Sequence, residues 1–156
     1  MSDPLAEVLI LGTMPGIKSL EAQQYYAHKQ NSFWKIMGEI LGFDPQIPYA
    51  ERTAYLGLHH IAVWDVLHSC EREGSLDSAI NCARTNDFEV YFSQHSHIKR
   101  ICFNGAVAER YFRMHVMRAL SQRDFTYVRL PSTSPAHASM NLHQKIQAWR
   151  SGLGLL

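Results

Sequence analysis

The stretch GTMPGIKSLEAQQYYAHKQNSFW, residues 12–34, follows directly on an apolar run, Val8-Leu9-Ile10-Leu11. A short apolar run bounded by turn residues is typical of a buried strand, so we predict a strand over residues 6–12. Two glycines on either side of Pro15 favour a tight turn whose backbone N–H groups point outward. The connection over residues 13–30 has the length of a functional loop rather than of a simple link. We therefore place a binding loop at the end of the first strand.

Strands and helices alternate along the rest of the chain. We predict further strands at residues 61–66, 100–104 and 125–130, each a short apolar run. Helical periodicity and capping residues predict helices near residues 33–41, 50–58, 75–81, 87–94, 106–120 and 141–151, with Asn31 and Asn86 as N-caps. Such alternation predicts a single α/β domain, residues 1–156, in which helices pack on a parallel sheet.

Composition narrows the class of protein. Hydrophobic residues make up 46% of the chain and charged residues 19%, as in ordinary globular domains. The apolar runs are only a few residues long, so no membrane span is expected, and the N-terminus lacks the pattern of a signal peptide. The three cysteines, Cys70, Cys82 and Cys102, form no CxxC pair. We expect reduced thiols in a cytoplasmic protein, with Cys102 inside a buried strand.

Charge is distributed unevenly along the chain. Residues 1–96 contain six Lys and Arg against twelve Asp and Glu, whereas residues 97–156 contain nine against two. Seven of those nine cations fall between residues 99 and 129. A basic half of this kind is a candidate surface for a polyanion such as DNA. The alternative is a solvated surface whose cations pair with acids from the first half.

Polar or glycine-rich residues stand at the C-terminal ends of all four predicted strands. They are Gly12-Thr13-Met14-Pro15-Gly16, Asp65, Asn104-Gly105 and Pro131-Ser132-Thr133-Ser134-Pro135. Ligands of parallel sheets bind outside the carboxyl ends of the strands, so these segments can converge on one site. The three hydroxyls between two prolines could hold a phosphate or a nucleotide backbone, or could simply cap the last helix. The first segment has neither a Walker nor a dinucleotide-binding pattern, and a plain turn would explain it as well.

Two side chains late in the long connection can recognise a flat polar molecule. Tyr26, the second of two adjacent tyrosines, offers an aromatic face that can stack on a base. Asn31 offers an amide that is donor and acceptor at once, although an N-cap role also explains it. Phe33 and Trp34 follow the apolar pattern of the next helix and are assigned to the core.

Metal and serine-hydrolase chemistry have little support in the sequence. The nine histidines form neither an HExxH motif nor a cluster with cysteines at zinc spacing. A GxSxG motif is also missing. We therefore expect no metal and no other cofactor.

The segments GTMPG, YYAHKQNSFWKIM, AVWDVL and LPSTSPAHA together resemble the uracil-DNA glycosylase superfamily, most of all its deoxyinosine (hypoxanthine) DNA glycosylases. The resemblance runs from Val8 to Trp149. It implies a three-layer α/β/α sandwich with a central four-stranded, mainly parallel sheet, and a monofunctional, metal-free enzyme of base excision repair. Such an enzyme flips a deaminated base out of double- or single-stranded DNA and hydrolyses its N-glycosidic bond, which leaves an abasic site.

The same resemblance implies roles for individual residues. It implies a first active-site loop beside the base, which consists of Gly12, Thr13, Met14, Pro15 and Gly16. Asp65 is a further candidate for binding the base, and it could equally cap or brace the end of the sheet. Tyr26 would stack on the flipped base, and Asn31 would be the catalytic amide. The implied DNA contacts are Ser132, Thr133, Ser134, Pro135 and His137.

Two departures from the family pattern affect the expected substrate. Uracil-cleaving relatives carry Asp or Asn at the position of Met14, so we expect weak activity on uracil and a preference for hypoxanthine. Many relatives carry a histidine at the position of Ser132, and His137, five residues further on, is not its replacement. Two alternatives stay open: a damaged-DNA-binding protein with weak catalysis, and a nucleoside or nucleotide hydrolase of the same fold. We expect a monomer in each case.

Overall fold

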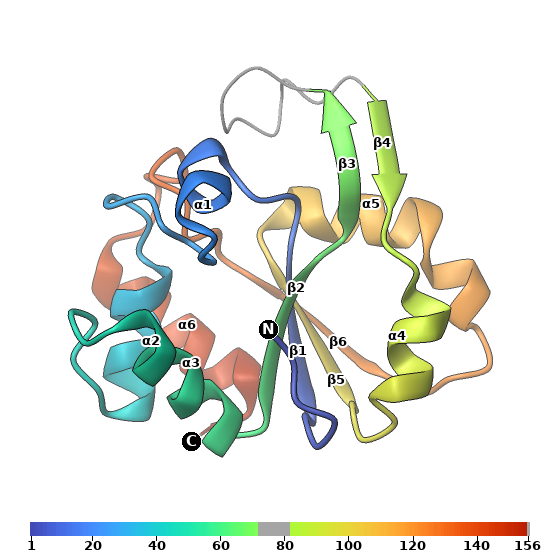
Figure 1. Ribbon diagram of the computed structural model, residues 1–156, viewed down its shortest axis with the longest axis horizontal. Helices are drawn as coiled ribbons and strands as arrows, with labels where there is room; N and C mark the ends of the chain where they lie inside the picture. Colours follow the sequence, from blue (N-terminus) through green and yellow to red (C-terminus); the bar gives the residue numbers. More distant parts are fainter. Residues whose placement is uncertain (72–81, 156) are drawn as a thin grey trace.

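A computed structural model describes residues 1–71 and 82–155 and places a four-stranded sheet at the centre (Figure 1). Its strands are β1 (Val8–Gly12), β2 (Ile61–Asp65), β5 (Arg100–Asn104) and β6 (Thr126–Leu130), in the order β2-β1-β5-β6. Each neighbouring pair is parallel, and the first residues of the strands lie opposite one another. All four strands therefore end at one edge of the sheet, as the parallel-sheet prediction requires.

Helices cover both faces of the sheet, because successive residues of a strand point to opposite sides. Leu9 and Leu11 of β1 pack in a core with α4 (Phe88–Gln94) and α5 (Ala106–His115). Ile10 points the other way, into a core with α2 (Phe33–Leu41), α3 (Tyr49–Leu58) and α6 (Leu142–Leu153). Figure 1 shows these two helical layers on either side of the strands, with α2, α3 and α6 on the left and α4 and α5 on the right. The predicted three-layer α/β/α sandwich is confirmed.

The helix-end signals explain where two of these helices stop and start. Gly42 ends α2 with a left-handed φ of +81°, which glycine adopts without the strain of a side chain. Asn141 begins α6 in a capping box, since its side chain accepts from the Gln144 N–H while the Gln144 side chain accepts from the Asn141 N–H. The start of α6 agrees with the helix predicted from residue 141.

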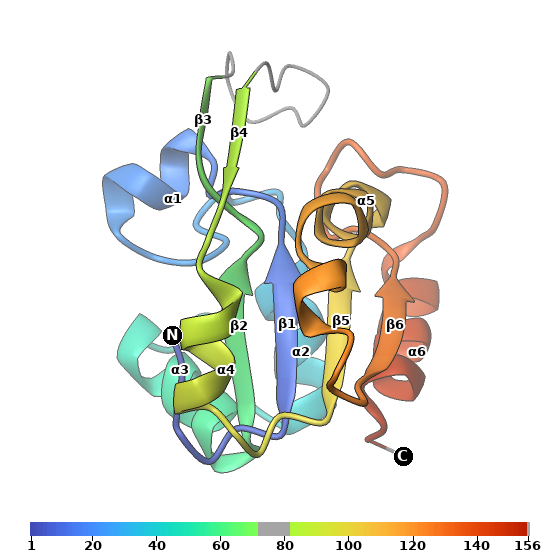
Figure 2. The ribbon, with the colours of Figure 1, turned by 90° about the vertical axis from the view of Figure 1, so that its right-hand side faces the viewer.

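Several local predictions were wrong. Residues 13–30 contain a short helix, α1 (Ile17–Ala22), above the carboxyl edge of the sheet (Figure 2). An antiparallel hairpin, β3 (Leu67–Glu71) and β4 (Cys82–Thr85), follows β2, and the helix predicted at 75–81 lies outside the described residues. The helix predicted at 106–120 ends at His115, and a separate 3-10 helix covers Met117–Leu120.

Asn86 does not cap α4 as predicted. Asp87 takes that place, and its side chain accepts a hydrogen bond from the Val90 N–H. The Asn86 amide instead donates to the backbone oxygen of Asp65 at 2.8 Å, which ties the start of α4 to the end of β2. The Asn86 side chain therefore binds the end of β2 and does not cap the helix.

Two further sequence predictions concern the environment of the chain. Within the described ranges, no helix combines the length and the apolar composition that crossing a membrane would require. Cys102 lies in β5 and is fully buried, as predicted, and burial raises the pKa of its thiol to about 12. That thiol is therefore protonated at neutral pH and serves as a core side chain.

Candidate active site

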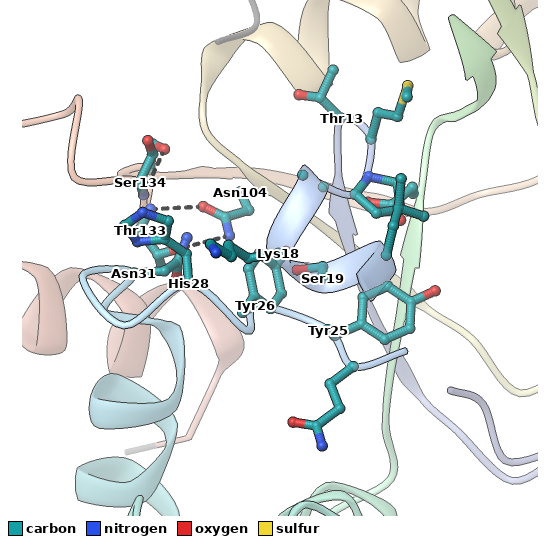
Figure 3. A pocket seen from close by; sticks show the side chains of 18 of the residues that line it. Thr13, Lys18, Ser19, Tyr25, Tyr26, His28, Asn31, Asn104, Thr133 and Ser134 are labelled. Atoms are coloured by element: carbon teal, nitrogen blue, oxygen red, sulfur yellow. Dashed lines mark hydrogen bonds between the residues drawn. The ribbon is translucent and has the colours of Figure 1, made fainter. Parts of the chain in front are cut away.

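A pocket of about 1110 Å³ lies at the carboxyl edge of the sheet (Figure 3). Its walls include the residues predicted at four separate places in the chain: Gly12, Thr13, Met14, Pro15, Gly16, Tyr26, Asn31, Asp65, Ser132, Thr133, Ser134 and Pro135. His137 is not part of these walls. Its backbone oxygen accepts from Lys145 Nζ at 2.9 Å, and its ring Nε2 lies 3.4 Å from the Ser139 hydroxyl. The fold thus brings together every predicted site residue except His137.

The first loop approaches two polar side chains so closely that only glycine fits at its start. A Cβ atom on Gly12 would lie 2.8 Å from Oδ1 of Asp65 and 3.0 Å from the hydroxyl oxygen of Tyr26. Asp65 ends β2 and is 7% exposed, whereas Tyr26 comes from the connection before α2. A carboxylate and a phenol from distant segments therefore close around the end of β1.

Tyr26 is fixed against a buried ring. It stacks on Phe33 with ring centroids 4.1 Å apart and planes at 25°, and Phe33 is fully buried. One face of the tyrosine is therefore covered by α2, while the side chain borders the pocket. This geometry suits an aromatic platform whose orientation is set before a ligand arrives.

The two ends of the Asn31 side-chain amide have different surroundings. Its Oδ1 accepts the Phe33 N–H at 3.0 Å, which satisfies a free donor of the first turn of α2. The N-cap position itself belongs to Ser32, whose side chain makes no capping bond. Within the described chain, the Asn31 Nδ2 group donates to no protein acceptor, and the residue borders the pocket. One end of the amide holds the helix, and the other end is available to a ligand.

A residue that the sequence analysis left without a role holds the second loop. Asn104, at the end of β5, donates from Nδ2 to Thr133 Oγ1 and accepts the Thr133 N–H at Oδ1, both at 2.9 Å (Figure 3). The Thr133 oxygen in turn accepts from the backbone N–H of Ser32 at 3.0 Å and from its hydroxyl at 3.2 Å. Thr133 is 1% exposed, so its side chain fastens the loop, whereas Ser132, Ser134 and Pro135 are accessible.

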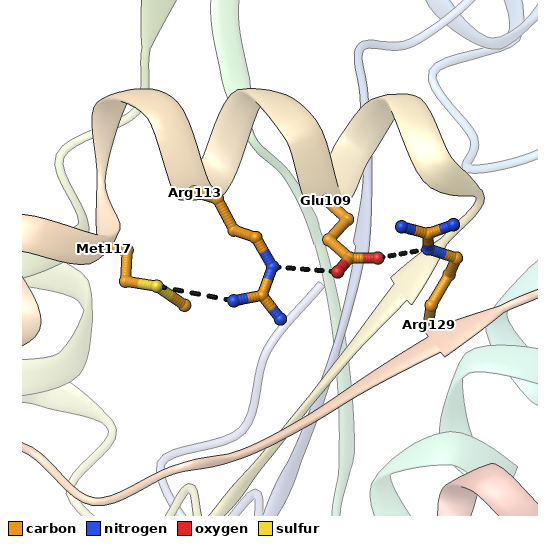
Figure 4. Close-up of polar contacts among 4 residues, drawn as sticks. All are labelled: Glu109, Arg113, Met117 and Arg129. Atoms are coloured by element: carbon orange, nitrogen blue, oxygen red, sulfur yellow. Dashed lines mark hydrogen bonds and ion pairs between the residues drawn. The ribbon is translucent and has the colours of Figure 1, made fainter.

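The basic residues between 99 and 129 do not gather around the pocket. Lys99 and Arg100 lie at the amino end of β5, at the opposite edge of the sheet. Arg113 and Arg129 both bind Glu109 on α5, the former through Nε and Oε1 at 2.8 Å (Figure 4). These two arginines are therefore partly neutralised within the protein.

Glu109 titrates below its ordinary range. Burial raises the pKa of this carboxyl group, but the hydrogen bonds and charges of Arg129 and Arg113 outweigh burial and lower the pKa overall. Lys18 and His28 are the basic side chains found in the described pocket walls. Among residues 1–71 and 82–155, no group of three His, Cys, Asp or Glu side chains is arranged to hold a metal ion.

Comparisons with known proteins agree with the fold and point to one family. The model of the uracil DNA glycosylase superfamily matches residues 1–151. Two relatives named hypoxanthine DNA glycosylase, from Methanosarcina barkeri and Methanosarcina acetivorans, are each 37% identical over 110 residues, which is 70% of this chain and 70% of the relative. The solution NMR structure of a candidate uracil DNA glycosylase from Methanosarcina acetivorans superposes with a TM-score of 0.81. The two sequences are 30% identical, and the superposition covers 99% of this chain and 93% of the other.

Proposed function

This chain belongs to the uracil DNA glycosylase superfamily and is a DNA glycosylase, and we propose that it releases hypoxanthine from deoxyinosine in DNA. The names of its two Methanosarcina relatives support this choice of base. The proposed enzyme is monofunctional: it hydrolyses the N-glycosidic bond and leaves an abasic site for other repair enzymes.

The reaction requires a pocket, a donor for the leaving base and a positioned water. A base inside a duplex is reached only after extrusion, which costs a few kcal/mol. As the glycosidic bond breaks, negative charge develops on the base and positive charge on the sugar. Donors fixed toward the base therefore lower the barrier, because they need no rearrangement as the charge develops. In this proposal the Asn31 Nδ2 group is that donor, and Tyr26 stacks on the base.

The observation that carries the proposal is the unequal use of the two ends of the Asn31 amide. The Phe33 N–H holds Oδ1 at 3.0 Å, so the plane of the amide is anchored to the first turn of α2. The donor end borders a pocket that is also lined by Tyr26 and by the half-buried residues Ser132 and Ser134. A rigidly mounted donor beside an aromatic platform suits a flat heterocycle with acceptor atoms at its edge.

Met14 supports the choice of hypoxanthine over uracil. It borders the pocket at the position where uracil-cleaving relatives carry an acidic or amide side chain, and it packs against the core under α4 and α5. A thioether is only a weak acceptor and cannot orient water as a carboxylate does. Asp65 is the acidic residue among the described pocket walls, and we assign it to the base or the attacking water.

A substrate panel tests the proposal. Labelled duplexes with one deoxyinosine, deoxyuridine, deoxyxanthosine or undamaged purine are incubated with the protein and then treated with hot alkali, which cuts the strand at abasic sites. We expect cutting to be fastest with deoxyinosine and slow with deoxyuridine. The same four bases in single strands measure the strand preference.

Each other outcome contradicts the proposal in a different way. Binding to the damaged duplex without strand cutting would indicate a damage-recognition protein. Release of hypoxanthine from free inosine but not from DNA would indicate a nucleoside hydrolase. Fast cutting at uracil would contradict the role given to Met14.

A further inference from the structure

Tyr26 has a backbone conformation that residues other than glycine rarely adopt. Its φ is +56°, and among the described non-glycine residues only Gln23 and His60 share a positive φ. The left-handed region is sterically unfavourable for an L residue with a side chain, so it persists only where the surroundings hold it. Gln23 occupies the C-cap of α1, where this conformation is common. Tyr26 instead lies in a connection, beside the pocket.

Side chains from two helices hold both peptide groups that flank Tyr26. The carbonyl oxygen of Tyr25, in the preceding peptide, accepts from Trp34 Nε1 at 2.8 Å. The Ala27 N–H, in the following peptide, donates to the Ser19 hydroxyl of α1 at 3.1 Å. Since these two peptide planes define the φ and ψ of Tyr26, their fixation fixes its backbone.

A third contact strengthens the hold before Tyr26. The Tyr25 N–H donates to the Tyr49 hydroxyl of α3 at 3.1 Å. Trp34 and Tyr49 meet edge to face, with ring centroids 5.8 Å apart. The Arg52 guanidinium lies over both rings, 4.7 Å from the Trp34 centroid and 5.4 Å from that of Tyr49. The two side chains that bind Tyr25 are thus locked to one another.

We propose that Trp34, Tyr49 and Ser19 are positioning residues that hold Tyr26 in its strained conformation, so that its ring is ready for the flipped base. This inference depends on the proposed function, because it assigns the ring a nucleobase as its ligand. Without these bonds the backbone relaxes to negative φ, and the ring leaves Phe33. The free energy needed to restore the ring position is then added to the cost of binding the base.

Single-atom substitutions test the proposal without changing ring packing. Tyr49→Phe removes the hydroxyl acceptor and keeps the ring, and Tyr55→Phe on the same helix is the matched control outside the pocket walls. We expect Tyr49→Phe to lower kcat/KM on a deoxyinosine duplex about 2- to 10-fold, the usual net effect of one hydrogen bond. Tyr55→Phe should leave it unchanged. Ser19→Ala should act like Tyr49→Phe.

A double-mutant cycle distinguishes positioning of Tyr26 from a general structural effect. In a Tyr26→Ala background, Tyr49→Phe should cause no further loss, since the ring that it positions is gone. Equal losses in both backgrounds, or no loss in either, would overturn the proposal.

Hydrogen exchange at the amides of residues 25–27 provides a readout that needs no activity. Exchange should be faster in Tyr49→Phe than in Tyr55→Phe. Unchanged exchange would overturn the hold on the backbone, even if the wild-type protein released no base. Failure of the proposed function would appear separately, as a wild-type protein inactive on every DNA substrate.

Discussion

Replacing Asn31 with aspartate separates the observed helix contact of its side chain from its proposed role as a donor to the base. Oδ1 of either residue can accept the Phe33 N–H bond, which is 3.0 Å long in the structure, but only asparagine has the Nδ2 donor. Keeping the capping bond avoids a loss of about 1 kcal/mol, and a carboxylate at a helix N-terminus adds roughly 0.3–1 kcal/mol of favourable interaction with the helix dipole. We therefore expect Asn31→Asp to be at least as stable as the wild type, and Asn31→Ala to be about 1 kcal/mol less stable.

Both variants should lose excision activity. Removing one donor that faces developing negative charge costs about 10²- to 10³-fold in rate, and the aspartate adds repulsion toward the departing base anion. Single-turnover cutting of a deoxyinosine duplex measures the rate. Urea unfolding measures stability, where 1 kcal/mol with a slope near 2 kcal/mol per M moves the midpoint by about 0.5 M.

Asn141 provides the matched control. It is the N-cap of α6, its Oδ1 also accepts a backbone N–H of the first helical turn, that of Gln144 at 2.9 Å, and it lies outside the pocket walls. Asn141→Asp should change stability alone. An Asn31→Asp variant that releases hypoxanthine at the wild-type rate would refute the role of the amide donor. An Asn31→Ala variant that is fully active but less stable would reduce Asn31 to a helix cap.

Three further predictions follow from the fold and the site. Gly12→Ala should abolish excision, because the new Cβ would lie 2.8 Å from Oδ1 of Asp65 and 3.0 Å from the hydroxyl oxygen of Tyr26. The control Gly57→Ala, whose Cβ would meet no atom within 4 Å, should leave stability unchanged or raise it by up to about 1 kcal/mol. Wild-type excision by the Gly12 variant would show that the first loop tolerates displacement. Asn104→Ala should lower the free energy of unfolding by about 2–4 kcal/mol, since it removes two hydrogen bonds and leaves the buried Thr133 N–H unsatisfied. Urea titration measures this loss, and a loss below about 1 kcal/mol would mean that the second loop is held by its other contacts. Glu109→Gln should be less stable than the wild type at neutral pH, and this difference in stability should become smaller in acid. The native pKa of Glu109 lies below the ordinary value of 4.5, so the stabilisation by its carboxylate is complete above that pH and disappears as the pH falls through the lowered pKa. A stability difference that is the same at pH 7 and pH 3 would contradict this assignment.

The sheet was predictable because its strands carry a strong signal. Leu9, Ile10 and Leu11 are completely buried on both faces, and such continuous apolar runs separate well from their polar surroundings. Helix α1 gave no such signal, because it buries none of its residues and exposes Ile17 and Leu20. The β3–β4 hairpin was also missed, since its sequence is mixed and polar without clear alternation.

The location of the site was predictable, but its internal bonds were not. Parallel strands end together, which is enough to group Gly12, Asp65 and the loop after β6. The bonds between Asn104 and Thr133 join residues 29 positions apart, and the bond from Tyr25 to Tyr49 spans 24. Local spacing carries no information about such pairs, because they depend on how the helices pack. For Asn31, the sequence offered two roles as alternatives, whereas in the structure Oδ1 accepts the Phe33 N–H and the proposed donor role belongs to the other end of the amide.

The contact between Ser32 and Thr133 spans 101 positions and has a consequence for biosynthesis. On a translating ribosome β1 emerges early, yet one of its two neighbours, β5, is made long after it. A nascent chain that has not reached Thr133 therefore lacks one wall of the cavity and the anchor for the start of α2. Non-local pairing of this kind slows folding. It also means that the complete pocket is assembled only after residue 133 has been synthesised.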